Sequence, residues 1–212
     1  MTDISSFIKF AIDNEVLQFG EFTTKAGRLS PYFFNLGNCS DGESLKRLGE
    51  YYAQTIQHHQ IPFDMIFGPA YKGISLASSI AIALSQKGKN VPFCFNRKEI
   101  KDHGEGGKVI GAQIKGKVLI VDDVISAGTS ITESVKLISD LGGAPCGIIV
   151  AIDRQEKGQS NLSAIQEMEA KYAIPIISII NLDEIKKYLI DNEGLGENLR
   201  AIEKYQNQYG VR

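Results

Sequence analysis

The sequence contains no tryptophan and only three cysteines among its 212 residues. Cys39, Cys94 and Cys146 are odd in number and far apart, and they form no C-x-x-C pair, which argues against a disulfide framework and against a zinc site. We interpret them as small buried hydrophobic residues in a reducing compartment. No apolar run approaches the roughly 18 residues that a membrane-spanning helix needs, and no basic N-terminal segment resembles a secretion signal. The sequence therefore predicts a cytoplasmic protein without a membrane partner.

The sequence also lacks a marked excess of charge of either sign, because 23 basic and 25 acidic residues leave a formal net charge of −2. Such a weak field does not favour nucleic acid as a partner. With 43% hydrophobic and 23% charged residues, the composition is that of a globular chain and excludes a disordered or fibrous one. Glycine alone is in excess: it contributes 21 residues, about a tenth of the chain, where about 7% is usual.

The hydrophobic pattern changes near residue 63. Before it, we expect helices over 3–13 and 43–59, with extended segments between 15 and 36. After it, short apolar runs alternate with helical patterns. The expected strands are 63–67, 91–95, 117–121, 147–152 and 176–180, and the expected helices are 73–87, 131–142 and 161–172. This alternation predicts an α/β fold with a central parallel sheet and helices on both faces. Ligands bind such sheets at the carboxyl ends of the strands, which directs attention to loops 68–73, 96–108, 122–130 and 153–158.

The loop after the 117–121 strand combines acidic and hydroxyl residues with a glycine. Asp122 and Asp123 come first, Ser126, Thr129 and Ser130 follow around Gly128, and a helix begins there. Backbone amides at a helix N-terminus attract an anion, and carboxylates accept hydrogen bonds from vicinal hydroxyls. The pattern therefore indicates a ribose 5-phosphate. The alternative is plain helix capping, since Ser130 and Glu133 have the spacing of a capping box.

Two common nucleotide-binding motifs fail. The segment Gly68–Gly73 has the spacing of a phosphate-binding loop, but Ile74 stands where that motif needs lysine. The segment beginning at Gly104 starts like a dinucleotide fingerprint, yet Val109 occupies its last glycine position.

The segment VDDVISAGTS at 121–130 resembles the phosphoribosyl-diphosphate signature of the type I phosphoribosyltransferases. Four further segments narrow the resemblance to the orotate phosphoribosyltransferase family: FTTK at 22–25, SPYFFN at 30–35, GPAYKG at 68–73 and RKEIKDHGEGG at 97–107. The resemblance implies the type I phosphoribosyltransferase fold, with a central mostly parallel sheet flanked by helices and a small N-terminal hood. Residues 1–212 would form one domain, with a core at 61–182 and a hood built from 1–60 and part of the C-terminal region.

The resemblance also implies a pentosyl transfer in pyrimidine biosynthesis. Phosphoribosyl diphosphate would give its ribose 5-phosphate to orotate, which yields orotidine 5′-monophosphate and pyrophosphate. Magnesium would arrive with the substrate, without a direct protein ligand, and the enzyme would be a homodimer with shared active sites. The charged 97–107 segment would be a lid over the pyrophosphate that reaches the neighbouring subunit's site. Its glycines suit such mobility, whereas the alternative is a solvated run of charge.

The same resemblance assigns site residues. Phosphoribosyl diphosphate would be bound by Lys25, Tyr71, Lys72, Arg97, Lys98, Lys101, His103, Asp122, Asp123, Val124, Ile125, Ser126, Ala127, Gly128, Thr129 and Ser130. Orotate would be bound by Lys25, Phe33, Phe34, Ser126 and Arg154. The catalytic group would comprise Lys101, Lys72, Asp123 and His103, with Lys101 the foremost and no residue ranked as general base. Ser126 stands where many members have threonine and keeps the hydroxyl. Ordinary alternatives are a surface lysine at 72, two core phenylalanines at 33 and 34, and a surface ion pair at Arg154.

Two other functions compete with this hypothesis. A purine or uracil phosphoribosyltransferase would share the 121–130 segment but gives no reason for Lys25, the phenylalanine pair and Arg154. A non-enzymatic sensor of phosphoribosyl diphosphate would keep the fold, but the first sixty residues contain nothing like a basic nucleic-acid-binding domain.

Overall fold

The structure is a computed structural model that describes residues 3–24, 27–101, 107–126, 128–192 and 194–211, with the side chains of Ile100 and Lys101 left out. At its centre lies a six-stranded sheet with the strand order β5-β4-β3-β6-β7-β8. The strands are β3 (Met65–Gly68), β4 (Phe93–Lys101), β5 (Gly107–Gly111), β6 (Lys117–Val121), β7 (Ala144–Asp153) and β8 (Ile176–Asn181).

The order of the strands reverses at the middle of the sheet. β3 pairs in parallel with β4 on one side and with β6 on the other, and β6, β7 and β8 continue in parallel. Only β5 is antiparallel, to β4. The chain passes from β3 to β4 on one side of β3 and later returns to β6 on its other side. The loops after β3 and β6 therefore diverge and leave a crevice at the carboxyl edge of the sheet. The predicted mostly parallel sheet is confirmed.

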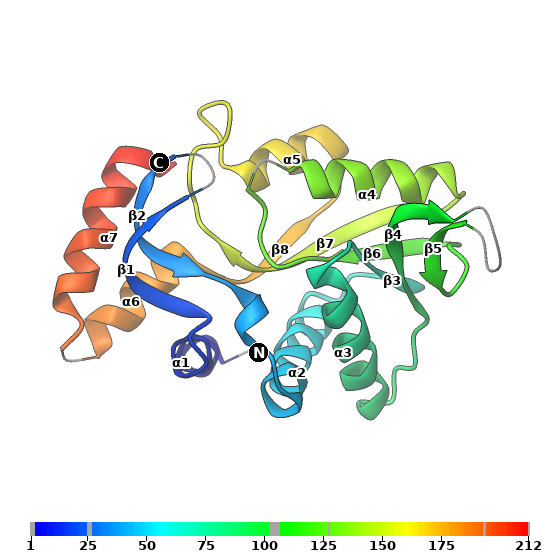
Figure 1. The fold of residues 1–212 in the computed structure, drawn as a ribbon, viewed down its shortest axis with the longest axis horizontal. Helices are drawn as coiled ribbons and strands as arrows, with labels where there is room; N and C mark the ends of the chain where they lie inside the picture. Colours follow the sequence, from blue (N-terminus) through cyan, green and yellow to red (C-terminus); the bar gives the residue numbers. More distant parts are fainter. Residues whose placement is uncertain (1–2, 25–26, 102–106, 127, 193, 212) are drawn as a thin grey trace.

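Alternating side chains of the sheet enter two cores. Ile66 and Leu119 belong to the core shared with α2 (Gly42–His59) and α3 (Lys72–Gln86), whereas Phe67 and Ile120 face the core under α4 (Thr129–Asp140) and α5 (Ala164–Tyr172). Figure 1 shows these helix pairs on opposite faces of the sheet. This explains the continuous apolar run in β6, since a strand covered on both faces has no polar side.

A smaller layer lies beside the β8 end of the sheet. It contains α1 (Ile4–Asp13), the antiparallel hairpin of β1 (Leu17–Thr23) and β2 (Leu29–Phe34), and the helices α6 (Leu182–Asp191) and α7 (Gly196–Tyr209). A short 3-10 turn, Leu36–Asn38, leads from β2 towards α2. Figure 1 shows the hairpin beside α7, so segments from both ends of the chain meet here. The expected extended and helical segments are thus both present.

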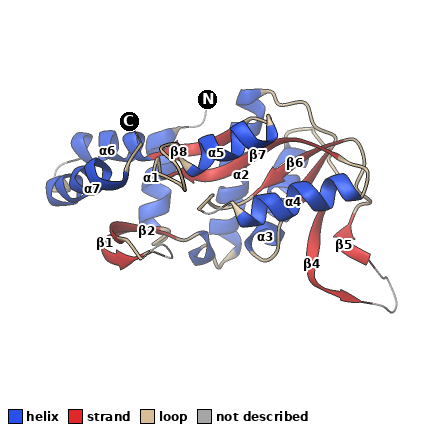
Figure 2. Ribbon diagram, turned by 90° about the horizontal axis from the view of Figure 1, so that it is seen from above, coloured by secondary structure: helices blue, strands red, loops and turns tan. Residues whose placement is uncertain are grey.

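Several boundaries differ from the sequence-based expectation, including the start of α5 at Ala164 rather than at 161. Residues 96–101 and 107–108, predicted as parts of one loop, are strand residues of the β4–β5 hairpin, which Figure 2 shows extending away from the sheet edge. Backbone pairing of Phe95 with Ile110 and of Asn96 with Val109 starts this hairpin, so charged side chains occupy a strand. β7 begins at Ala144, three residues earlier than 147, next to a register shift opposite Val118 and Leu119. No helix in the described ranges is both long and apolar enough to cross a bilayer.

Candidate active site

Two loops meet across the crevice between β3 and β6. Lys72 begins α3 after the β3 loop, and Asp123 follows β6. The Lys72 Nζ donates to Asp123 Oδ2 at 2.5 Å. The Lys72 side chain is 45% exposed while that of Asp123 is only 12% exposed, so the ammonium reaches in from the crevice and keeps donors directed to solvent. Residues from two predicted motifs are thus in direct contact.

Asp122 and Asp123 are both buried at the end of β6. The buried Tyr52 hydroxyl donates to the Asp122 backbone oxygen at 2.8 Å, and Ser130 Oγ donates to Asp122 Oδ2 at 3.1 Å. Burial, together with the neighbouring Asp123 charge, raises the pKa of the Asp122 carboxyl to about 7. A ligand whose hydroxyl groups donate hydrogen bonds to this carboxyl would stabilise its ionised form.

The N-terminus of α4 has no side-chain cap. Gly128 is the N-cap residue with φ of 70°, and no side chain bonds the first amides of the helix among the described residues. Ser130 donates its hydroxyl to Asp122 instead, so the capping box considered for Ser130 and Glu133 is not formed. The positive φ of Gly128 favours glycine, and a Cβ there would lie 2.6 Å from Met168 Sδ, so the flexible methionine side chain would have to shift. The uncapped amides and the positive end of the helix favour an anion.

The remaining residues of this loop differ in exposure. Ser126 and Thr129 are exposed beside the helix N-terminus, whereas Ile125 is buried and Val124 forms an isolated bridge with Ile152. Ala127 lies outside the described residues.

The loop after β3 is held against its own helix and against β4. Cβ atoms at Gly68 or Gly73 would overlap the backbone of the other residue, so the β3 end and the α3 start touch directly. The Ala70 amide donates to Asn96 Oδ1 at 2.6 Å. Tyr71, next to Lys72, is 74% exposed. Sequence reasoning missed Asn96, although it directly precedes the predicted Arg97.

Arg97 and Lys98 lie in β4 at the base of the β4–β5 hairpin. They line a pocket of about 230 Å³ together with Lys108 of β5 and Glu133 of α4. Lys101 ends β4, but its side chain is not described, and His103 falls outside the described residues. The structure thus brings the first two predicted lid cations to the edge of the sheet beside Asn96.

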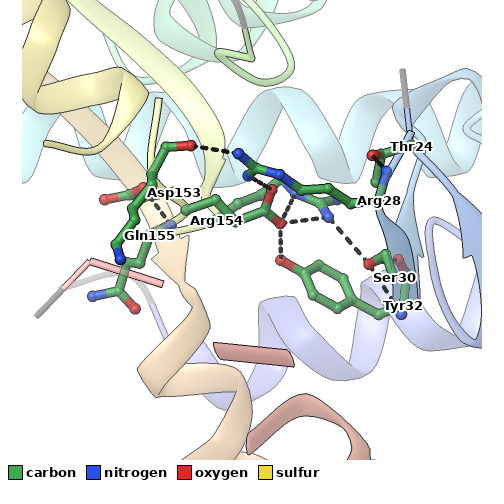
Figure 3. A network of polar contacts seen from close by, with 9 residues as sticks. Thr24, Arg28, Ser30, Tyr32, Asp153, Arg154 and Gln155 are labelled. Carbon is green, nitrogen blue, oxygen red and sulfur yellow. Dashed lines mark hydrogen bonds and ion pairs between the residues drawn. The ribbon is translucent and has the colours of Figure 1, made fainter. Parts of the chain in front are cut away.

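Arg154 follows β7 and belongs to a network of polar contacts with the β1–β2 hairpin (Figure 3). Its Nε donates to Glu156 Oε1 at 2.7 Å, and its Nη2 forms an ion pair with the same oxygen at 2.6 Å. The Nη2 group also donates to Ser30 Oγ at 3.2 Å. The guanidinium lies over the Tyr32 ring, with Cζ 4.4 Å from the ring centroid. The side chains of Arg154 and Glu156 are each 16% exposed. Arg154 is therefore not an exposed surface residue.

The two predicted phenylalanines point in opposite directions from β2. Phe34 is 6% exposed and belongs to the main core, whereas Phe33 is 42% exposed and stacks on Phe22 with ring centroids 5.4 Å apart. The core interpretation thus holds for the side chain of Phe34. The aromatic surface of the β1–β2 hairpin comes from Phe22 and Phe33. Lys25 lies outside the described residues.

Within the described ranges, no three His, Cys, Asp or Glu side chains gather into a group that could hold a metal ion. The buried acidic pair therefore suits hydroxyl ligands, or an ion whose remaining ligands come from elsewhere.

Comparison with known proteins agrees with this geometry. The phosphoribosyl transferase domain matches residues 40–171. The orotate phosphoribosyltransferase of Nitrosospira multiformis is 59% identical over 206 residues, which cover 97% of this chain and 90% of that protein. The enzyme of the same name from Neisseria meningitidis is 54% identical over 212 residues and all of both chains. The crystal structure of orotate phosphoribosyltransferase from Francisella tularensis has a TM-score of 0.88 at 38% identity and covers 97% of this chain and 100% of that one.

Proposed function

The chain belongs to the orotate phosphoribosyltransferase family and has its type I phosphoribosyltransferase fold, and from this premise we propose that it transfers ribose 5-phosphate from phosphoribosyl diphosphate to orotate. The products are orotidine 5′-monophosphate and pyrophosphate, and the reaction is a step of pyrimidine biosynthesis. The uncapped start of α4 beside the buried Asp122–Asp123 pair is the observation that carries this proposal. It offers one site for a phosphate and, next to it, one for vicinal hydroxyls.

The ribose 5-phosphate binds at the loop after β6. Its phosphate accepts hydrogen bonds from the first amides of α4 and from the exposed hydroxyls of Ser126 and Thr129, while Gly128 lets the backbone approach. The ribose hydroxyls donate to Asp122 and Asp123. Because Asp123 also accepts from Lys72, this carboxylate connects the ribose to the group that meets the pyrophosphate.

The pyrophosphate end lies towards the β3 loop and the hairpin. Tyr71 and Lys72 hold the diphosphate from one side, and Arg97, Lys98, Lys101 and His103 close over it from the other. As the anomeric bond breaks, these cations stabilise the negative charge of the leaving group. Magnesium carried in with the diphosphate would supply further neutralising charge for the leaving group. As the orotate nitrogen bonds to the anomeric carbon, its N–H proton passes to the leaving pyrophosphate or to solvent, so neither Asp123 nor His103 is assigned the role of a strong base.

Orotate lies against the β1–β2 side of the crevice. Arg154 pairs with its carboxylate, for which a planar guanidinium is suited, and Lys25 and Ser126 lie between the two substrates. The backbone of Phe33 and Phe34 meets the polar edge of the ring. This set distinguishes orotate from purines and uracil.

The proposal is tested by a direct assay with magnesium and phosphoribosyl diphosphate. Orotate, adenine, hypoxanthine and uracil are offered separately, and nucleotide formation is followed chromatographically. We expect conversion of orotate alone at an appreciable rate. Preferred conversion of a purine or of uracil would assign the site to a different phosphoribosyltransferase, and the absence of any product would favour a non-enzymatic sensor.

We further propose that residues 1–212 form one domain, that the protein is cytoplasmic, and that two copies share their active sites through the hairpin. The position of Lys101 at the end of a strand that extends from the sheet edge supports such sharing. Mixing Lys101→Ala with Arg154→Ala protein would then place both defects in one site and leave the other intact. Partial return of activity is expected, and its absence after demonstrated subunit exchange would exclude shared sites.

A further inference from the structure

The guanidinium of Arg154 is fixed along one edge by a single carboxylate. Glu156 Oε1 accepts a hydrogen bond from Nε and forms an ion pair with Nη2, so one carboxylate oxygen contacts two guanidinium nitrogens and fixes the plane of the group. The Tyr32 ring below it prevents rotation out of this plane. Neither Glu156 nor Ser30 bonds Nη1, and the hydrogens of Nη1 form the open edge left for a ligand carboxylate.

Glu156 is itself held from several directions. Arg28 Nη1 lies 3.4 Å from Glu156 Oε2, and the Tyr32 hydroxyl donates to Oε1 at 3.4 Å. Burial raises the pKa of Tyr32 above its usual range, so this hydroxyl stays protonated and remains a donor. Arg28 in turn donates to the Lys157 backbone oxygen at 3.1 Å. Glu156 thus lies between two guanidinium groups that come from different parts of the chain.

The net charge of Arg28, Arg154 and Glu156 is positive, so one bound anion would neutralise it. Arg28 and Arg154 contribute two positive charges and Glu156 one negative charge, and their side chains are 23%, 16% and 16% exposed. Partly buried charges of this kind are stable only when they are paired and well oriented. A ligand carboxylate on the open edge of Arg154 would balance the remaining charge.

The backbone around Glu156 is fastened by the end of α7. The Lys157 amide donates to the Tyr209 oxygen at 2.8 Å, and the Val211 amide donates to the Gln155 oxygen at 2.9 Å. Glu156 and Gly210 form an isolated bridge between these two bonds. The Glu156 side chain is therefore attached to a fixed backbone, which it needs in order to orient the Arg154 side chain.

We propose that Glu156 is a positioning residue that aims Arg154 at the orotate carboxylate and so contributes to the preference for a carboxylated pyrimidine. This inference rests on the proposed function and adds a residue to it. Glu156 acts through Arg154 and makes no contact with the reacting atoms. Its loss therefore weakens the use of orotate and leaves the use of phosphoribosyl diphosphate unchanged.

A double-mutant cycle tests this role. Steady-state constants for both substrates are measured for the wild type, Glu156→Gln, Arg154→Ala and the double variant, with kcat/KM used where orotate cannot be saturated. We expect Glu156→Gln to raise the KM for orotate about tenfold, the effect typical of removing a residue that orients a ligand-binding side chain. In the Arg154→Ala background the same change should alter kcat/KM for orotate by less than about twofold, because the group that it orients is gone.

Two further variants separate positioning from charge balance and from general damage. Glu156→Asp keeps the charge but withdraws the carboxylate, so positioning predicts a raised KM for orotate here as well; this variant also serves if Glu156→Gln does not fold. Glu167→Gln is the matched control. The Glu167 carboxylate accepts a hydrogen bond from Ser160, which lies with Glu156 in the loop between β7 and α5, and it does not contact Arg154. This variant should behave like the wild type.

The outcomes are distinct from those that test the function itself. If the wild type converts orotate but Glu156→Asp matches it, or Glu156→Gln lowers the KM for orotate, Glu156 only balances charge and the positioning role is wrong. An equal effect of Glu156→Gln with and without Arg154, or an equal rise in the KM for phosphoribosyl diphosphate, would show a merely structural role. If the wild type fails to convert orotate, the proposed function fails before the variants are compared.

Discussion

Replacing Tyr52 by phenylalanine isolates one buried hydrogen bond that supports the acidic pair. Tyr52 is fully buried in α2, and its hydroxyl donates at 2.8 Å to the Asp122 backbone oxygen across 70 residues of sequence. Phenylalanine keeps the ring and its packing, so the change removes the donor and little else. Burial raises the pKa of Tyr52, and the wild-type hydroxyl is therefore a neutral donor throughout the accessible pH range.

The magnitude follows from leaving a buried carbonyl oxygen without this donor. Such a loss costs about 1–3 kcal/mol of unfolding free energy. For a chain of this size, each kcal/mol lowers the melting temperature by roughly 2–4 °C. Because Asp122 also loses its backbone support, the KM for phosphoribosyl diphosphate should rise about threefold to tenfold, equivalent to roughly 0.7–1.4 kcal/mol. Denaturant unfolding at fixed protein concentration gives the first quantity and steady-state kinetics the second.

Tyr51→Phe is the matched control, one residue away on the same helix. Tyr51 is also largely buried, but its hydroxyl contacts Ser6 Oγ at 2.8 Å and accepts from Arg47 Nη2 at 3.4 Å, and both bonds are part-buried and do not involve Asp122. We expect a smaller loss of stability and unchanged kinetics. If Tyr52→Phe loses less than about 0.5 kcal/mol, the size of an ordinary surface substitution, or if both variants change the KM for phosphoribosyl diphosphate equally, the reasoning about Asp122 is refuted.

Three other measurements examine the pyrophosphate end, the acidic pair and the β3 loop. Lys101→Ala should lower kcat by about 10²–10³, the scale of losing one preorganised charge contact; activity within about twofold of the wild type would remove Lys101 from the catalytic group. Since burial and the Asp123 charge raise the pKa of Asp122 to about 7, the folded protein keeps this proton at a pH where the unfolded chain has lost it. The Asp122 contribution to stability should therefore decline as the pH rises from about 4 to about 7, and Asp122→Asn should remove that decline in unfolding experiments across this interval. An unchanged pH profile in Asp122→Asn would show that the Asp122 carboxyl is already ionised at low pH. Asn96→Ala removes the acceptor for the Ala70 amide and should raise the KM for phosphoribosyl diphosphate more than that for orotate, at a cost of about 1 kcal/mol in stability; equal changes in both KM values would indicate general loosening instead.

The parts of the fold that were predictable depend on local pattern. The apolar run of β6 and the helical spacing after it identify a buried strand followed by a helix, because both depend on side chains close together in the sequence. The carboxyl-edge rule then brings loops 68–73 and 122–130 together, and the Lys72–Asp123 contact agrees with it. The start of α4 at Gly128 lies where the sequence predicts an anion site, and the helix N-terminus there has no side-chain cap.

The parts that were not predictable depend on long-range pairing. Arg28 meets Glu156 across 128 residues, and neither residue has a local pattern that identifies the other. Tyr52 looks like one more aromatic residue on the apolar face of α2 until its hydroxyl is placed against Asp122. The β4 strand was interpreted as a loop beyond Phe95 because its charged residues at 97–101 do not alternate with apolar ones. Its pairing with β5 is visible only when both strands are in place.

The fastening of the Gln155–Lys157 backbone by Tyr209–Val211 has a consequence for how the site is made during synthesis. A ribosome releases the chain from its N-terminus onwards, so the strands and loops that form the phosphate end emerge well before α7. The Arg154 loop is therefore not fastened until Tyr209–Val211, more than fifty residues later in the sequence, has been synthesised. The two halves of one binding site are therefore completed at different times, and a nascent chain stalled before residue 209 would have its phosphate end in place while its orotate end was still unfastened.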